Sequence, residues 1–457
     1  MSISELGKYI DGKKHGHLIG IGGVSMAPLA EVLSGLGVFV TGSDMNRSES
    51  VEHLMSLGID IKIGHAPENI DGADFIVRTA AAREDNVEIA EARKRGIPIF
   101  ERAEAWGHIM RSYKNAVCVS GTHGKTTTTS MITHIFMNSS IDPTVMIGGT
   151  LPLLKAGHRI GGGDTIVMES CEYYNSFLSF SPTVALILNI EADHLDFFKD
   201  IEDIKKSFRK FASLVPEKTG TVIANGDDKN TTDALAGLDR KIITFGLAKT
   251  NDVYADNIEF IGSTSEFDVV YNGEKFVHLK LNIPGIHNVK NAVAATTAAI
   301  ILGVEPENIA EALAKFSGAG RRFEYKGEVN GAMVYDDYAH HPGELKALLD
   351  MALNLSYDRV ILCFQPHTYS RTKALFDDFV EQLARADKAY LCEIYAAREQ
   401  NTIGISSRDL CDKIPGSEYF ATFEELEEKL RREAKNGELI LTVGAGNIYR
   451  VGEEIVK

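Results

Sequence analysis

The feature that constrains the fold most is the segment from Asn115 to Met137, where an apolar run leads into a glycine turn and then a helix-like stretch. A strand, a glycine turn and a helix in this order form the unit from which parallel sheets with covering helices are built. The turn, SGTHGKTTTT, is shorter than the common phosphate-binding loop, because Val119 stands where that loop has its first glycine. The segment predicts an α/β fold and raises the question of what so short a turn binds.

The same order of elements recurs on both sides of this segment. In the N-terminal part, we expect a strand over His17 to Ile21, a helix over Met26 to Leu36 and a strand over Val38 to Thr41. The C-terminal part alternates again after a glycine-rich stretch at Gly318. A chain of 457 residues is long enough for about three domains. The predicted domains cover residues 1–108, 109–317 and 318–457.

Charge and composition exclude several classes of partner. The chain has 48 basic and 64 acidic residues and a net charge of −16, so neither nucleic acid nor an anionic membrane is expected to bind it. The longest run of small apolar residues, Ala292 to Val304, is too short to cross a bilayer, which takes about 20 apolar residues. Five scattered cysteines without a C-x-x-C pair, and an N-terminus without an apolar core segment, predict a reducing, cytoplasmic location.

The central glycine turn carries the residue types that hold a phosphate and a metal. Backbone N–H groups around Gly124 can surround a phosphate, Lys125 can neutralise it, and the Thr126 hydroxyl can bind Mg²⁺. The alternative is a polar helix start in which Lys125 is only solvated, and the flanking strand and helix disfavour it. The residues predicted for this site are Gly121, Thr122, His123, Gly124, Lys125, Thr126 and Thr127.

Carboxylates and a histidine follow two further strands of the central part. Glu169 ends the run TIVME, where its carboxylate can reach a metal at the glycine turn, and Glu172 is an alternative just past the strand. The run NIEADHLD follows another strand and suits a second metal or a substrate phosphate, with an ordinary surface turn as the alternative. Its polar residues are Asn189, Glu191, Asp193, His194 and Asp196.

The N-terminal turn, Gly20 to Ser25, nearly matches the dinucleotide-binding fingerprint, with Ser25 where the third glycine belongs. Gly22 and Gly23 form its centre, and Asp44 follows the next strand, near where an acid can accept a hydrogen bond from a ribose hydroxyl. The near-match favours a nucleotide or sugar-nucleotide site over a merely tight turn.

Polar residues also gather at the start of a long helix and after the second domain. His287, Asn288 and Asn291 open the helix, and the spacing of the two asparagines lets both amides face one site. A simple N-cap is the alternative for Asn288. Arg321 and Arg322 follow a glycine-rich hinge, where they form either a solvated face or a phosphate clamp.

The run YDDYAHHPGE places two adjacent carboxylates and two histidines together, a composition that invites a zinc site. Successive strand residues point to opposite faces, however, and no second cluster has metal-ligand spacing. A site for a small zwitterion and its amine suits these residues better. They are Asp336, Asp337, Tyr338, His340, His341 and Glu344.

Taken together, several motifs resemble those of the Mur ligases, in order and over nearly the whole chain. The motifs are GIGGVSMAPLAEVL, GTHGKTTT, NIEADHLD, HNVKNAVAA, RRFE, DDYAHHPGE, FQPHTYSRT and GAGN. His123 resembles the branch that adds L-alanine and its murein-peptide recycling relative, and FQPH favours the former. The resemblance implies an α/β enzyme of three domains: an N-terminal Rossmann-like domain that binds the UDP substrate, a central P-loop ATPase-type mixed sheet that binds ATP, and a C-terminal Rossmann-like domain that binds the amino acid.

The implied reaction is ATP-dependent amide synthesis, a step of peptidoglycan precursor synthesis. ATP and Mg²⁺ are the implied cofactors, and UDP-N-acetylmuramate, L-alanine and ATP are the substrates of a monomer or dimer. The lactyl carboxylate attacks the γ-phosphate of ATP, and L-alanine then displaces phosphate from the acyl phosphate.

The resemblance also implies a role for individual residues. Lys125 contacts the β- and γ-phosphates, Thr126 and Glu169 hold the ATP magnesium, and His194 holds a second Mg²⁺ beside the acyl acceptor. Further groups are implied at the adenine and ribose (His287, Asn288, Asn291), at the closed ATP site (Arg322, Asp337), around L-alanine (Tyr338, His340, Arg371) and at the UDP substrate (Gly22, Gly23, Ser25, Asp44, His194).

The chain departs from the family pattern at a few positions. Ser25 replaces a glycine, Cys171 stands in a run that is often more acidic, and Thr368 stands where many members have a second arginine. The alternatives are a recycling ligase that takes a tripeptide, an NAD-dependent dehydrogenase and a nucleotide-binding regulator without turnover.

Overall fold

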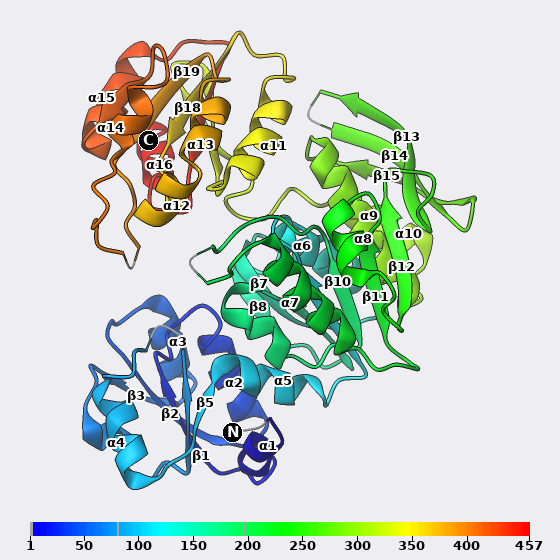
Figure 1. Cartoon of the computed structure of the whole chain (residues 1–457), viewed down its shortest axis with the longest axis vertical. Helices are drawn as coiled ribbons and strands as arrows, with labels where there is room; N and C mark the ends of the chain where they lie inside the picture. The colour runs from blue at the N-terminus through cyan, green and yellow to red at the C-terminus, as the bar shows by residue number, and fades with distance from the viewer. Residues whose placement is uncertain (1–2, 80–81, 196, 263, 398) are drawn as a thin grey trace. The chain divides into compact units, whose positions relative to one another are not determined.

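The computed structural model describes residues 3–79, 82–195, 197–262, 264–397 and 399–457, so Asp196 lies outside the described residues. Three β-sheets, each accompanied by helices, follow one another along the chain (Figure 1). The predicted three-domain α/β fold is confirmed. No helix of the described ranges is long and apolar enough to cross a membrane.

The N-terminal sheet is parallel, with the strand order β3-β2-β1-β4-β5 of a Rossmann-like fold. Its strands are β1 (His15–Ile19), β2 (Phe39–Asp44), β3 (Asp60–Ile63), β4 (Phe75–Arg78) and β5 (Ile99–Glu101). Its helices are α1 (Ile3–Ile10), α2 (Ala27–Gly35), α3 (Glu49–Ser56), η1 (Pro67–Ile70), α4 (Val87–Arg95) and α5 (Arg102–Met110). The first strand ends earlier than predicted, because the N–H groups of Gly20 and Ile21 already turn to the carbonyl of Ser43.

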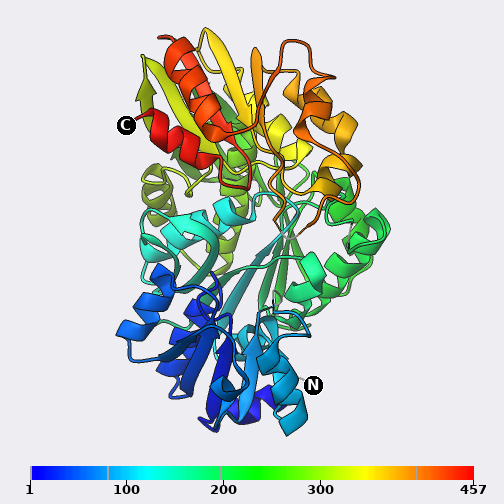
Figure 2. The ribbon, with the colours of Figure 1, turned by 90° about the vertical axis from the view of Figure 1, so that its left-hand side faces the viewer.

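Alternation along the strands gives this sheet two buried faces. Leu18 and Val77 pack with α1, α2 and α5, whereas Ile19 and Ile76 pack with η1 and α4 on the other face. Helices accordingly lie on both sides of the sheet (Figure 2). The glycine turn follows the carboxyl end of β1, and Asp44 is the last residue of β2.

The central sheet is mixed and has the order β15-β14-β13-β12-β11-β10-β6-β9-β7-β8. Its strands are β6 (Asn115–Ser120), β7 (Thr144–Leu151), β8 (Ala156–Arg159), β9 (Thr165–Glu169), β10 (Val184–Ile187), β11 (Thr221–Asn225), β12 (Lys241–Gly246), β13 (Val253–Ile261), β14 (Thr264–Tyr271) and β15 (Glu274–Leu281). The helices are α6 (Lys125–Met137), η2 (Tyr173–Ser179), α7 (Ile201–Ser213), α8 (Lys229–Leu235), α9 (Ile286–Ile301) and α10 (Pro306–Ala314). Because β9 and β10 both pair in parallel with β6, their carboxyl ends flank the turn that follows β6.

The C-terminal sheet has the order β16-β17-β21-β18-β19-β20, and only the β16–β17 pair is antiparallel among its described pairings. Its strands are β16 (Glu324–Val329), β17 (Ala332–Asp337), β18 (Arg359–Phe364), β19 (Lys388–Cys392), β20 (Glu418–Phe420) and β21 (Glu438–Val443). One face packs on α11 (Pro342–Ala352), α13 (Phe376–Leu383) and α14 (Ser407–Cys411), and the other on α15 (Phe423–Glu433) and α16 (Tyr449–Ile455). The short helix α12 (Tyr369–Ala374) follows β18.

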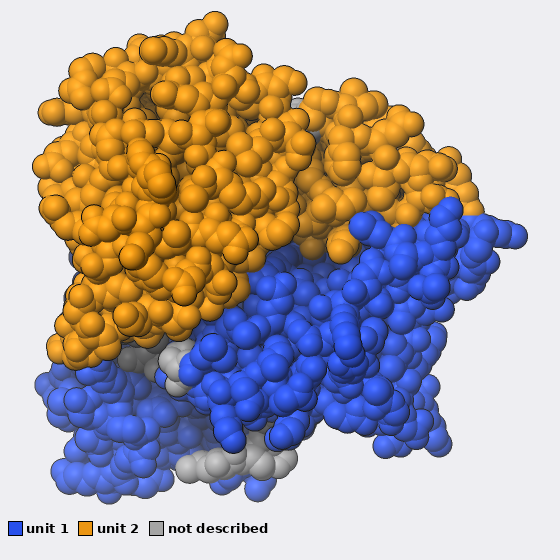
Figure 3. All heavy atoms as spheres, turned by 45° about the horizontal axis from the view of Figure 1, so that its top comes forward, with its two compact units in different colours: residues 1–254, 270–274, 292–312 blue, residues 255–269, 275–291, 313–457 orange. Residues whose placement is uncertain are grey.

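The chain packs into two compact units (Figure 3). One unit comprises Met1–Tyr254, Val270–Glu274 and Ala292–Ala312, and the other comprises Ala255–Val269, Lys275–Asn291 and Leu313–Lys457. The predicted domain boundaries after residues 108 and 317 stay predictions.

Candidate nucleotide-binding site

The turn between β6 and α6 is the centre of the site. Gly121 has a φ of +141°, and a Cβ at this position would lie 2.9 Å from Cβ of Leu188, so only glycine fits. The helix α6 begins at Lys125, directly after Gly124. The turn therefore presents the N–H groups of a helix start, which favour an anion.

Lys125 folds back onto this turn. Its Nζ donates to the carbonyl oxygens of Gly121 and Thr122, the latter at 3.0 Å, and lies 3.2 Å from Oε2 of Glu172. Burial opposes the charge of the ammonium, but the carboxylates of Glu172 and Glu169 outweigh that effect, so the pKa of Lys125 is raised. The lysine is thus held protonated beside the helix start, and the solvated-lysine alternative is wrong.

Thr126 and Glu169, the two predicted ligands of the ATP magnesium, contact each other next to the lysine. The Thr126 hydroxyl donates to Oε1 of Glu169 at 3.0 Å, and the N–H of Gly148 on β7 donates to Oε2 at 2.7 Å. One oxygen of the Glu169 carboxylate therefore accepts from a backbone N–H of β7, and the other accepts from the Thr126 hydroxyl. A hydroxyl and a carboxylate side by side suit Mg²⁺, which prefers oxygen ligands.

Glu172 and His194 continue the site away from the turn. Nε2 of His194 lies 3.9 Å from Oε1 of Glu172 and 3.8 Å from Oδ2 of Asp193. The imidazole stacks on the ring of Tyr173 at a centroid distance of 4.2 Å. Because Glu172 contacts both Lys125 and His194, it links the predicted ATP residue to the predicted second metal ligand.

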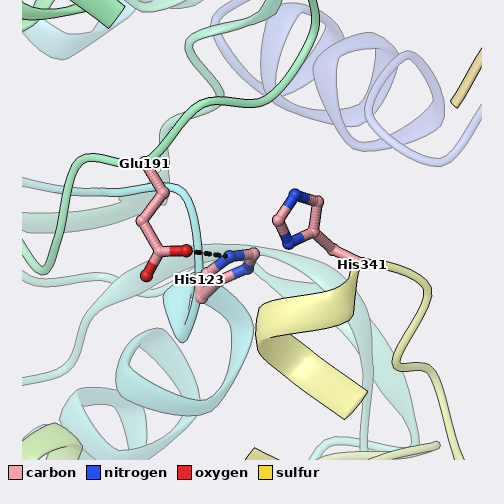
Figure 4. Close-up of side chains that lie close together, drawn as sticks. All are labelled: His123, Glu191 and His341. Atoms are coloured by element: carbon pink, nitrogen blue, oxygen red, sulfur yellow. Dashed lines mark ion pairs between the residues drawn. The ribbon is translucent and has the colours of Figure 1, made fainter. Parts of the chain in front are cut away.

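Asn189 clamps the turn through its side chain. Oδ1 accepts from the N–H of His123 at 2.8 Å, Nδ2 donates to the carbonyl of His123 at 3.1 Å, and the Asn189 carbonyl accepts from the N–H of Thr122 at 3.1 Å. The Thr122 hydroxyl accepts from the N–H of Glu191 at 2.9 Å. Nε2 of His123 pairs with Oε2 of Glu191 at 3.4 Å (Figure 4). The NIEADHLD run thus holds the turn in place through hydrogen bonds from Asn189 and Glu191.

The N-terminal glycine turn is organised around Asp44. Oδ2 of Asp44 accepts from the N–H of Gly22 at 2.9 Å, and Oδ1 accepts from the N–H of Asn46 at 3.1 Å. The carbonyl of Ser25 accepts from Nε1 of Trp106 at 3.2 Å. Gly22, Gly23 and Ser25 therefore lie in one turn, and Asp44 contacts this turn from the end of β2.

At the start of α9, Asn288 is not the N-cap, because the helix begins two residues earlier, at Ile286. Its Nδ2 instead donates to the carbonyl of Pro284 at 2.7 Å, and both Asn288 and Asn291 are buried. Burial and the charge of Arg322 lower the pKa of His287 to about 4. His287 is neutral at pH 7 and lies within electrostatic range of Arg322.

The two adjacent arginines have different surroundings. Arg321 donates to Oδ2 of Asp336 at 2.9 Å and to the carbonyls of Gly446 and Gly444 at 3.0 and 2.6 Å. Arg322 lies 3.9 Å from Oε1 of Glu344. Arg321 thus makes several hydrogen bonds within the C-terminal domain, whereas the contact of Arg322 with Glu344 is longer.

Asp336 and Asp337 also diverge, as expected for neighbours on a strand. Asp336 meets Arg321 and accepts from the Thr442 hydroxyl at 2.9 Å. Asp337 accepts from the N–H groups of Phe323 and Ala339, both at 2.8 Å. Burial raises the pKa of Asp337 to about 6, although the charge of Arg322 opposes the shift.

The residues predicted around L-alanine lie beyond the ends of β17 and β18. Nδ1 of His340 lies 2.9 Å from the carbonyl of Tyr338 and 3.2 Å from Oε2 of Glu344. Nη1 of Arg371 lies 3.3 Å from Nδ1 of His367, whose ring is 5.8 Å from that of His340. His341 has a local role, because its Nδ1 accepts from the N–H of Gly343 and caps α11.

Comparison with known proteins identifies the family of this chain. Three family models match: the Mur ligase family, catalytic domain over residues 15–114, the Mur ligase middle domain over 119–299, and the Mur ligase, glutamate ligase domain over 321–446. The UDP-N-acetylmuramate–L-alanine ligase of Agathobacter rectalis is 47% identical over 449 residues, which cover 97% of this chain and 98% of the relative. The chain belongs to the Mur ligase family.

Two solved Mur ligase structures match over nearly the full chain. The UDP-N-acetylmuramate-alanine ligase of Thermotoga maritima has a TM-score of 0.80 and 28% identity, covering 97% of this chain and 98% of its own. The murein peptide ligase of Psychrobacter arcticus has a TM-score of 0.70 and 26% identity, again covering 97% and 98%.

Some residues of this Mur ligase site escape sequence reasoning. The clamp by Asn189 depends on contacts across 66 positions of the chain, and no sequence motif predicts these contacts. No sequence pattern indicates a role for Gly148 either, although its N–H donates a hydrogen bond to the Glu169 carboxylate. The sequence indicates Glu172 only as an alternative metal ligand, whereas the structure shows its contact with Lys125.

Proposed function

We propose that this Mur ligase joins L-alanine to the lactyl carboxylate of UDP-N-acetylmuramate, converting ATP to ADP and phosphate in peptidoglycan precursor synthesis. The observation that carries the proposal is 47% identity to an alanine-adding relative over nearly the full length of both chains. The Lys125–Thr126–Glu169 arrangement supports it with the groups that a phosphoryl transfer requires.

The chemistry explains why ATP is required. A carboxylate is a poor acyl donor, because its oxygen cannot leave as the dianion, and phosphorylation converts that oxygen into a leaving group. The carboxylate oxygen forms a bond to the γ-phosphorus as the bond to ADP breaks. The amine of L-alanine then attacks the acyl carbon, and inorganic phosphate leaves. Most of the protein's contribution is positioning and charge neutralisation.

In this scheme Lys125 exchanges its contacts with Gly121, Thr122 and Glu172 for the phosphates of ATP. Thr126 and Glu169 would hold Mg²⁺, which neutralises phosphate charge, and their paired oxygens fit that ion. His194 is proposed as the ligand of a second Mg²⁺ beside the acceptor. His287, Asn288, Asn291, Arg322 and Asp337 are proposed to complete the ATP site, together with Thr122, His123, Gly124 and Thr127.

The other two substrates are assigned to the outer domains. Gly22, Gly23, Ser25 and Asp44 are proposed for the UDP substrate, and Tyr338, His340 and Arg371 for L-alanine. We keep the domain boundaries after residues 108 and 317, a cytoplasmic location and a monomeric or dimeric state as parts of the proposal.

A substrate-dropout assay tests the proposal. Phosphate release should require ATP, Mg²⁺, UDP-N-acetylmuramate and L-alanine together, and omission of any one should abolish it. Release with a tripeptide but not with L-alanine would favour the recycling ligase. Turnover of a nicotinamide cofactor, or ATP binding without phosphate release, would replace the ligase by a dehydrogenase or a regulator.

A further inference from the structure

The loops that carry Tyr174 and His194 hold their backbone in the left-handed region at residues other than glycine. The φ angle is +54° at Tyr174 and +56° at Asn175, both in η2, and +53° at His194. Bulky side chains rarely adopt this backbone, and such strain is commonly retained at ligand sites. Oε2 of Glu172 lies 3.2 Å from Nζ of Lys125, and its Oε1 lies 3.9 Å from Nε2 of His194. The strained loops therefore adjoin the central glycine turn through direct contacts.

The backbone of η2 is anchored on α7 by buried aromatic residues. Phe177 stacks on Phe211 at a centroid distance of 4.6 Å and meets Phe208 edge to face at 5.3 Å. The side chain of Asn175 accepts a hydrogen bond from the Ser207 hydroxyl, also on α7. These contacts hold the strained backbone in one conformation.

The rings of Tyr173, Tyr174, His194 and Phe197 form one aromatic cluster on these loops. Tyr173 stacks on His194 at a centroid distance of 4.2 Å and meets Tyr174 at 4.3 Å. Tyr174 in turn meets Phe197 at 4.9 Å. Tyr173 is half-buried, whereas Tyr174 is 58% and Phe197 is 36% exposed. The cluster thus leads from His194 to an exposed pair of rings, Tyr174 and Phe197, which we call the aromatic shelf.

The aromatic shelf is exposed although an apolar interior is close by in the chain. Phe198, the next residue after Phe197, is only 2% exposed. Exposure of two adjacent rings and the strain at Tyr174 both disfavour the free protein, and a ligand that covers the rings removes their apolar surface from water. A pyranose ring suits such a surface, because its faces carry C–H groups and its rim carries hydroxyls, so that one face can pack on an aromatic ring.

We propose that the aromatic shelf binds the pyranose ring of the sugar nucleotide. This inference rests on the proposed function, because it takes UDP-N-acetylmuramate as the ligand and sets its lactyl carboxylate beside His194. In that substrate only one carbon and one ether oxygen separate the carboxylate from the sugar ring. A carboxylate at His194 therefore leaves the sugar ring within reach of the aromatic cluster. Neither Tyr174 nor Phe197 takes part in phosphoryl transfer in this arrangement, so their contribution is to substrate binding.

Steady-state kinetics of the full-length protein test the inference. We expect Tyr174→Ala and Phe197→Leu each to raise the KM for UDP-N-acetylmuramate about tenfold, because a stacked ring is lost. The KM values for ATP and L-alanine should stay within about twofold. Tyr174→Phe keeps the ring and should behave like the wild type. Phe260→Leu is the matched control, because Phe260 on β13 is 52% exposed and lies outside the cluster.

Inhibition by UDP, which lacks the pyranose ring, locates the contact within the substrate. The inhibition constant of UDP should be the same for the wild type, Tyr174→Ala and Phe197→Leu. A loss of inhibition by UDP as large as the rise in KM would place the shelf at the nucleotide part and overturn the inference.

The remaining outcomes are equally decisive. An unchanged KM for the sugar nucleotide in Tyr174→Ala or Phe197→Leu would overturn the inference alone, as would an equal rise in the KM for ATP. A raised KM in Tyr174→Phe would assign the effect to the hydroxyl and overturn stacking by the ring. A wild-type protein that does not turn over UDP-N-acetylmuramate would overturn the proposed function and the inference with it.

Thermal unfolding of the ligand-free protein separates binding from structure. Asparagine tolerates the left-handed backbone better than tyrosine does, so Tyr174→Asn should melt at the wild-type temperature or above it. Its KM for UDP-N-acetylmuramate should nevertheless rise about tenfold, as for alanine. A raised KM with an unchanged or higher melting temperature supports the inference. A raised KM with a lowered melting temperature would give Tyr174 a structural role and overturn it.

Discussion

The two glycine turns of this protein share a plan and differ in how their polar groups are satisfied. Both leave a parallel strand and enter a helix, β1 to α2 and β6 to α6. In the N-terminal turn the carboxylate of Asp44 already accepts from the N–H of Gly22. In the central turn a lysine and a threonine open the helix, with Glu169 facing them.

The difference teaches that glycine spacing alone does not define an anion site. Because Asp44 already accepts from the N–H of Gly22, that N–H is not available to a phosphate, and a phosphate at the N-terminal turn would need other donors. The central turn carries its cation within the sequence of the loop. We therefore expect substitutions in the two turns to affect different substrates.

The largest expected effect is that of Lys125→Ala. Removal of the cation should lower the rate of phosphate release by about 10³-fold or more, because charge on the transferring phosphoryl group loses its neutralising partner. Affinity for UDP-N-acetylmuramate, measured by calorimetry, should stay within about twofold, since Lys125 belongs to the other turn.

Lys229→Ala is the control, because Lys229 is a largely exposed lysine that pairs only with Asp233 in the described ion pairs. Full activity of Lys125→Ala would show that the cation of the central turn is not needed for phosphate release, and it would contradict the proposed difference between the two turns.

Thr126→Val should follow in size. Loss of the hydroxyl removes an oxygen ligand, so we expect turnover about 10–100-fold lower, with partial recovery at high Mg²⁺. Thr129→Val is the matched control on the same helix, because the Thr129 hydroxyl is buried without a hydrogen-bond partner among the described residues. A magnesium titration of the steady-state rate measures the effect. Equal magnesium requirements in the two variants would remove Thr126 from the metal site.

Asn189→Asp should have a moderate effect. The substitution keeps an acceptor for the N–H of His123 but sets a carboxylate against its carbonyl, which distorts the clamp. We expect the KM for ATP to rise about tenfold, the effect of one lost buried hydrogen bond, with sugar-nucleotide affinity unchanged. The N-terminal turn has no such clamp from Asn189, so a matching loss of sugar-nucleotide affinity would contradict the comparison.

Asp44→Asn should have the smallest effect. An amide oxygen still accepts from the N–H of Gly22, but a neutral acceptor is weaker than a carboxylate. We expect UDP-N-acetylmuramate to bind about fivefold more weakly, a difference near 1 kcal/mol, with the KM for ATP unchanged. An effect on ATP as large as that on the sugar nucleotide would show that the turns are not independent.

Sequence patterns predicted the three α/β domains and the grouping of Lys125, Thr126 and Glu169. Both predictions rest on local information: periodicity identifies the strands, and polar residues after adjacent parallel strands meet at one edge. The contrast between Arg321 and Arg322 was beyond sequence reasoning, because it depends on which guanidinium reaches the carbonyls of Gly444 and Gly446, more than 120 positions away.

The internal contacts of Lys125 bear on which anions the protein admits. Its ammonium group has three N–H donors, and all three already have partners, the carbonyls of Gly121 and Thr122 and the carboxylate of Glu172. A lone phosphate or sulfate offers little in exchange for this complete set of contacts. A polyphosphate that also meets the helix start and Thr126 offers more, so we expect these internal contacts of Lys125 to disfavour small anions relative to a nucleotide.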